Sequence, residues 1–144
     1  MNDEPRVASL DVPSRIESVR PAAAFCVDTA RRQGVAAADH PLFEVAVVEA
    51  LNNALMHNQR EAEGVIHCEV EVAGRSLKIR VFDESARSPV TFPSGAASWP
   101  DPSLDSWETI PERGYGLYLI QAVFSDVRPV SRNGHHGVEM ELSF

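Results

Sequence analysis

Hydrophobic and polar residues alternate along several short stretches of the chain. A period of two is typical of a half-buried strand, with one face toward a core and the other toward water. The stretch 65–73 shows it most clearly, because His67, Glu69 and Glu71 alternate with apolar residues. The five segments predicted as strands are 6–12, 65–73, 77–83, 127–131 and 138–144.

Turn signals join four of these strands in pairs. The sequence AGRS at 73–76 connects the second and third strands as a hairpin. Asn133-Gly134 is a two-residue hairpin signal between the last two strands. Hairpins between neighbouring strands favour a largely antiparallel sheet.

Helical spacing of apolar residues predicts a first helix over 16–33. Ser14 and Glu17, three residues apart, form a capping-box pattern in which each side chain binds an amide of the first turn. Gly34 is expected to end the helix, because glycine readily adopts the left-handed conformation there.

A second helix is predicted over 42–57, and it is apolar on most of its surface. Such a helix belongs in the centre of a fold. Asp39 is its expected N-cap, and Pro41 suits the first turn, where a missing amide proton costs nothing. A third helix is expected within 114–125, after a pair of glycines.

Together the elements predict an α+β fold of two layers. The order is strand, helix, helix, strand, strand, long connection, helix, strand, strand. Three amphipathic helices should cover one face of a mostly antiparallel, mixed sheet. With 144 residues, the chain has the usual length of a single domain.

The long connection, 84–113, differs in composition from the rest of the chain. It holds five of the ten prolines and both tryptophans, Trp99 and Trp107. Long connections in compact domains are usually lids or binding loops, and tryptophans favour docking on a surface. A lid and a disordered insertion both remain open from composition alone.

Charge and composition exclude some classes of function. The chain has 13 Lys and Arg against 21 Asp and Glu, a net charge of −8. We therefore expect no direct binding to nucleic acid or to a membrane surface, since both need a basic face. The N-terminus is acidic, and no apolar run approaches a membrane span, so the sequence predicts a cytoplasmic protein. Cys26 and Cys68 are expected as small buried hydrophobes.

Polar residues on the second helix are the first candidates for chemistry. Glu49, Asn53 and His57 follow one another at steps of four, which places them in one slanted stripe. A carboxylate and a carboxamide on a largely buried helix need partners or a ligand. From the residues alone, a ligand site and a structural stripe that binds neighbouring loops both remain open.

Two further candidates follow along the chain. Asp83 ends a strand and begins the long connection, where it could contact a ligand or form an Asx turn. Gly114 and Gly116, after Arg113, open a helix whose N-terminal amides would suit an anion. The same glycines could instead serve tight packing, and no Walker motif follows them.

In combination these motifs resemble the Bergerat-type ATP-binding fold of gyrase, the large heat-shock chaperone and sensor histidine kinases. The run EALNNALMH at 49–57 resembles the asparagine box of that superfamily. The run VFDE at 81–84 is similar to the start of its aspartate box, and GYGLYLI at 114–120 to its second glycine box. The resemblance extends from about residue 6 to residue 144 and implies one histidine-kinase-like ATPase domain, with 84–113 as its lid.

Within the superfamily, the chain resembles bacterial anti-sigma-factor serine kinases of partner-switching systems. It shows no dimerisation helix pair with a phospho-accepting histidine and no transducer domain. The resemblance implies a serine/threonine-protein kinase that binds ATP and Mg²⁺. It also implies two protein partners: a sigma factor that it sequesters and an anti-anti-sigma antagonist that it phosphorylates. We also expect a homodimer.

The resemblance implies a role for each matching residue. Glu49 would orient or deprotonate the attacking hydroxyl, and Asn53 would ligate Mg²⁺. Asp83 would accept a hydrogen bond from the adenine amino group. His57 matches a frequent residue of the box, and a structural role for it remains open. Contacts to the phosphates are expected from Arg113, Gly114 and Gly116.

One segment departs from the family pattern. Where the aspartate box normally has D-x-G-x-G, this chain has DESAR at 83–87. Ser85 and Arg87 replace glycines that let the backbone approach the nucleotide. The departure motivates an alternative: a non-catalytic switch module of the same fold with weak or lost ATP binding. A further alternative is a regulator of another signalling protein, such as a phosphatase.

Overall fold

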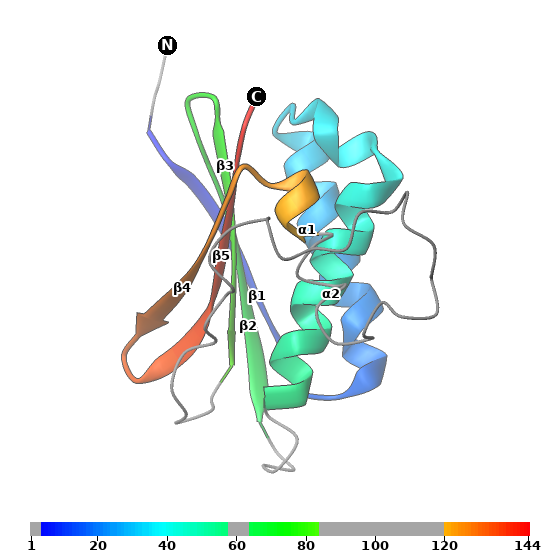
Figure 1. The fold of residues 1–144 in the computed structure, drawn as a ribbon, viewed down its shortest axis with the longest axis vertical. Helices are drawn as coiled ribbons and strands as arrows, with labels where there is room; N and C mark the ends of the chain where they lie inside the picture. Colours follow the sequence, from blue (N-terminus) through cyan, green and yellow to red (C-terminus); the bar gives the residue numbers. More distant parts are fainter. Residues whose placement is uncertain (1–3, 58–63, 84–119) are drawn as a thin grey trace, which may run out of the picture.

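The computed structural model describes residues 4–57, 64–83 and 120–144, and the side chains of Met56 and His57 lie outside this description. Figure 1 shows one sheet with the helices beside it. A short helical segment at 120–123 precedes β4. The other elements are β1 (Arg6–Pro13), the 3-10 helix η1 (Ile16–Ser18), α1 (Val19–Arg32), the 3-10 helix η2 (Ala36–Asp39), α2 (Pro41–His57), β2 (Val65–Ala73), β3 (Ser76–Asp83), β4 (Asp126–Arg132) and β5 (His135–Ser143).

The sheet has five strands in the order β1-β2-β3-β5-β4. Every neighbouring pair is antiparallel. The helices cover one face (Figure 1), which confirms the predicted α+β class of two layers. The expectation of a mixed sheet is wrong for the described strands, because each sheet neighbour runs in the opposite direction.

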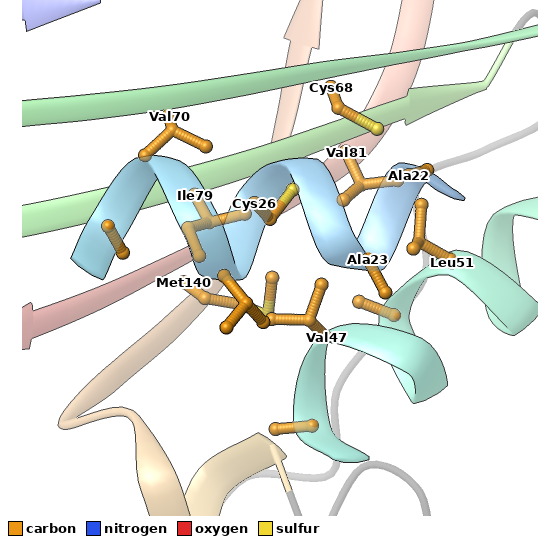
Figure 2. Close-up of a cluster of buried hydrophobic side chains, with 14 of the residues drawn as sticks. Ala22, Ala23, Cys26, Val47, Leu51, Cys68, Val70, Ile79, Val81 and Met140 are labelled. Carbon is orange, nitrogen blue, oxygen red and sulfur yellow. The ribbon is translucent and has the colours of Figure 1, made fainter. Parts of the chain in front are cut away.

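Small apolar side chains bring the helices close to the sheet. Figure 2 shows Ala23 and Cys26 of α1 in one cluster with Leu51 of α2 and the strand residues Cys68 and Val81. All five are at most 1% exposed. Cys26 and Cys68 are free thiols, as expected, and a hydrogen bond between them, together with burial, raises the pKa of Cys26.

Alternation along the strands separates an apolar face from a charged face. On β3, Ile79 and Val81 are buried under the helices. Arg80, between them, faces the uncovered side, where its guanidinium donates from Nε to Glu139 of β5 at 2.6 Å and from Nη1 to Glu71 of β2 at 3.1 Å. The uncovered face is therefore held by ion pairs that run from strand to strand.

The first helical region begins differently from the predicted capping box. Residues 16–18 form η1 rather than the first turn of α1, and no side chain caps either element. The hydroxyl of Ser14 is buried and makes no hydrogen bond among the described residues. Its backbone N–H donates to the carbonyl of Gly64 at 2.8 Å, so tertiary contact with the start of β2 holds this segment. The helix ends as predicted, beside Gly34 with a φ of +87°.

The N-terminus of α2 also differs from its prediction. Pro41 occupies the first helical position as expected. The cap, however, comes from His40, whose Nδ1 accepts a hydrogen bond from the backbone N–H of Leu42 at 3.1 Å. Asp39 instead ends η2 and accepts a hydrogen bond from Nε of Arg31 at 2.7 Å. An available arginine on α1 thus draws the carboxylate away from the helix terminus.

Candidate functional site

The polar stripe on α2 lies along the flank of the helix. Glu49 and Asn53 are half-buried and one turn apart, as the sequence predicts. The neighbouring residues Ala46, Ala50 and Ala54 are at most 5% exposed and face the core. The carboxylate and the carboxamide therefore border the packed face while remaining reachable from water.

Asp83 lies at the end of β3 and is only 3% exposed. Its place in the alternation with Ile79 and Val81 puts it on the helix-covered face of the sheet. A carboxylate buried to this degree needs polar partners, because desolvation disfavours its charged form. Asp83 thus lies buried at a strand end, the place where the sequence analysis expected either a ligand contact or an Asx turn.

Chain direction brings α2 and Asp83 to one end of the molecule. The helix ends at His57, and β2 starts at Val65 and pairs antiparallel with β3. Because β3 runs antiparallel to β2, the end of β3 lies beside the start of β2, at the end of the sheet where the chain arrives from α2. Figure 1 shows the C-terminal half of α2, the end of β3 and the start of β5 together at the lower end. Helix α2 also packs on β3, so the elements that carry the stripe and Asp83 are neighbours in the fold.

The structure adds His136 to this region, a residue that the sequence analysis did not select. His136 is the register partner of Asp83 in the antiparallel pair of β3 and β5. Its Nδ1 atom is buried and has no hydrogen-bond partner among the described residues. The signal was present in the sequence, because His136 alternates with Val138 and Met140 on the apolar face of its strand.

The remaining predicted site residues lie outside the described part of the chain. They are the expected phosphate contacts Arg113, Gly114 and Gly116, the two replaced glycine positions Ser85 and Arg87, and both lid tryptophans. The side chain of His57 lies outside it as well.

The described donor groups include one candidate metal ligand, the carboxamide of Asn53. Among the residues of 4–57, 64–83 and 120–144, no group of three or more His, Cys, Asp or Glu side chains could hold a metal ion. A carboxamide such as that of Asn53 offers the hard oxygen that Mg²⁺ prefers, and half-burial leaves it accessible. Asn53 thus fits a role as a single protein ligand beside the phosphates of a nucleotide.

A separate shallow pocket of about 260 Å³ opens at the same end, on the uncovered face of the sheet. His67 lies in its wall, hydrogen-bonded through Nδ1 to Asp11 and through Nε2 to Glu69 at 3.0 Å. Burial alone would lower the pKa of His67, but these two carboxylates outweigh it and raise the pKa. Arg132 lies 5.0 Å from the ring centroid of Phe82 in the same wall and pairs with Glu69. The polar groups of this pocket therefore largely satisfy one another.

Comparison with known families agrees with the fold. The profile of the histidine kinase-like ATPase domain matches residues 12–144. The chain belongs to this family. Membership supports ATP binding and a general ATP-using activity of the kinase or ATPase type. No curated protein matches this chain at a significant level. None of the helices in the described ranges combines the length and hydropathy that a bilayer crossing demands.

Proposed function

We propose that this protein is a cytoplasmic anti-sigma factor and serine-protein kinase. It binds ATP, sequesters an alternative sigma factor and phosphorylates a Ser or Thr of an anti-anti-sigma antagonist. The observation that supports the proposal most is the half-buried Glu49–Asn53 pair, one turn apart on the flank of α2. A carboxylate base and a carboxamide metal ligand one turn apart are the groups that phosphoryl transfer needs.

Each residue has a distinct task in this proposal. Glu49 accepts the proton of the attacking hydroxyl or orients it. Asn53 holds Mg²⁺, which would supply positive charge beside the phosphates. The carboxylate of Asp83 accepts a hydrogen bond from the adenine amino group. Phosphoryl transfer depends mostly on positioning and electrostatics, so three well-placed side chains carry much of the chemistry.

Charge gives the proposed switch its direction. The protein has a net charge of −8. A phosphate adds up to about two negative charges to the antagonist, which would weaken its docking on an acidic partner. The unphosphorylated antagonist would bind the protein and release the sigma factor, whereas phosphorylation would return the protein to the sigma factor.

The direct test is phosphate transfer from γ-labelled ATP to a candidate antagonist. We expect label on the antagonist with the natural protein and strong loss of label with Asn53→Ala. Calorimetry with millimolar Mg·ATP, with and without the antagonist, serves as the accompanying measurement. Absence of binding heat in both conditions would contradict the kinase proposal.

A second candidate is a switch module of the same fold that has the same partners but little or no kinase activity. Ser85 and Arg87, at positions where the family has glycines, favour it. If these side chains obstruct the nucleotide, Ser85→Gly combined with Arg87→Gly should tighten Mg·ATP binding. If the guanidinium of Arg87 contacts phosphate instead, the same double variant should bind Mg·ATP more weakly.

A further inference from the structure

Two buried side-chain polar atoms make no hydrogen bond among the described residues: the Oγ of Ser14 and the Nδ1 of His136. Most buried polar atoms in native proteins are hydrogen-bonded, so each exception needs an explanation. Ser14 is at the β1 edge of the sheet, beside Gly64. His136 is in β5, which β2 and β3 separate from β1, and lies in the candidate site.

Register places His136 directly beside Asp83. The two residues are the last partners of the β3–β5 ladder. Directly paired residues of antiparallel strands project from the same face, with Cβ atoms about 5 Å apart. Because Asp83 is on the helix-covered face, the imidazole of His136 is on that face too.

Gly137 holds this end of the ladder together. A Cβ atom on Gly137 would lie 2.0 Å from the backbone oxygen of Val81 and 2.8 Å from the Cα of Phe82. Strand β5 can therefore approach β3 this closely only with glycine at this position. The close approach occurs one residue from His136, so the backbone holds His136 and Asp83 side by side in the ladder.

We infer that His136 is a specificity-determining residue for the nucleotide base, and that its Nδ1 binds the base edge beside Asp83. The inference rests on the proposed function in one respect, which is that the site binds ATP. It assigns a second protein side chain, besides Asp83, to recognition of the base. The unpartnered nitrogen is then a group that becomes hydrogen-bonded only when the nucleotide is present.

The chemistry of the pair selects among purines. A carboxylate only accepts hydrogen bonds, and the Nδ1–H tautomer of a neutral imidazole donates one. Adenine offers a matching edge, with an amino group that donates next to a ring nitrogen that accepts. Hypoxanthine carries an oxygen that accepts and a ring N–H that donates at the same two positions. The pair of Asp83 and His136 should therefore prefer ATP over inosine triphosphate.

The test measures nucleotide binding by calorimetry on the full chain, with Mg·ATP and Mg·ITP as probes. His136→Gln and His136→Asn separate the two ring nitrogens, because the amide of glutamine reaches about as far as Nε2 and that of asparagine about as far as Nδ1. His135→Gln is the matched control, since His135 is the adjacent residue and projects from the opposite face of β5. Thermal unfolding of each variant checks its folding.

We expect the natural protein to bind Mg·ATP roughly 10-fold more tightly than Mg·ITP, the scale of about one net hydrogen bond. His136→Gln should bind Mg·ATP about 10-fold more weakly and show a smaller preference for ATP, since only the contribution of Asp83 remains. His136→Asn and His135→Gln should stay close to the natural protein.

Equal affinity of His136→Gln and the natural protein for Mg·ATP would overturn the inference alone. Equal binding of ATP and ITP by the natural protein would also overturn it, even if His136→Gln fails to fold. Absence of all nucleotide binding would overturn the proposed function together with the inference. Binding that depends on His136 without any phosphate transfer would support the inference and contradict only the kinase activity.

Discussion

At the scale of single residues, the polar groups of α2 are separated by their position around the helix. Glu49 and Asn53 are half-buried beside the core face, whereas Glu44 is exposed in the first turn. Two glutamates of one helix therefore meet different environments. This difference provides a matched test of which carboxylate takes part in the chemistry.

We expect Glu49→Gln to reduce phosphate transfer about 10²–10⁴-fold, the usual contribution of a general base. Mg·ATP affinity should change little, because Asn53 and Asp83 remain. Transfer of label from γ-labelled ATP gives the rate, and calorimetry gives the affinity. Glu44→Gln, the same substitution on the exposed side, should leave both unchanged. An unchanged rate in Glu49→Gln would assign Glu49 a structural role.

At the scale of elements, helix ends and strand contacts depend on particular tertiary neighbours. The α1 region is held at its start by the backbone bond between Ser14 and Gly64, and α2 by the imidazole of His40. Strands β3 and β5 approach closely because Gly137 has no side chain. These details make the stability of each element sensitive to different residues.

The caps give the first element-scale prediction. His40→Ala should destabilise the protein by about 1 kcal/mol, the usual cost of a lost N-cap. Ser14→Ala should cost nothing or stabilise, because it removes a buried hydroxyl that makes no hydrogen bond among the described residues. Urea unfolding of both variants measures the two free energies. A larger loss for Ser14→Ala than for His40→Ala would restore the predicted capping box.

Two glycine positions, Gly137 and Gly34, give the second element-scale prediction. Gly137→Ala should destabilise strongly, at the upper end of the about 1–3 kcal/mol typical of overpacking, because its Cβ would meet the backbone of β3. Gly34→Ala has open space around the new Cβ and should cost only about 1 kcal/mol for its φ of +87°. Thermal unfolding compares them, and equal losses would contradict the close approach of β5 to β3.

At the scale of the whole molecule, the uncovered face of the sheet is an ionic network. Glu139 accepts hydrogen bonds from Nε of Arg80 and from Nε of Arg128, each at 2.6 Å. Burial would raise the pKa of Glu139, but the two guanidinium groups outweigh it and lower the pKa. The pKa of His67 is shifted in the opposite sense, since its carboxylate partners raise it.

These two shifts predict opposite pH effects on stability. The contribution of Glu139 is present above its unfolded pKa of about 4.3 and is lost as pH falls through the lower folded pKa. The contribution of His67 is present below about pH 6.5 and is lost as pH rises through the higher folded pKa. Urea unfolding across this range should therefore show the highest stability in mildly acidic solution.

Variants separate the two contributions. The stability difference between the natural protein and His67→Gln should shrink as pH rises above about 6.5, and that for Glu139→Gln should shrink as pH falls below about 4.3. Ser9→Ala, on the exposed face of β1, provides a control without a titrating group. A pH-independent difference for either test variant would show that its charge does not contribute to folding.

Local patterns were sufficient for most of the architecture. The alternation at 65–73 and 77–83 and the apolar surface of 42–57 predicted β2, β3 and α2 to within a residue or two. The spacing of Glu49 and Asn53 placed both on one flank of α2, and that arrangement is confirmed. These features depend on backbone periodicity, which neighbouring residues determine among themselves.

What the sequence by itself determined is the type and order of the elements, the face of each that is buried, and the presence of Asp83 at a strand end. Only the tertiary structure decided which distant groups meet. It paired Asp83 with His136, gave the cap of α2 to His40 and drew Asp39 to Arg31. The reason is physical: periodicity is a local property of the backbone, whereas a hydrogen bond between remote side chains depends on strand register and on the competing partners that folding brings within reach.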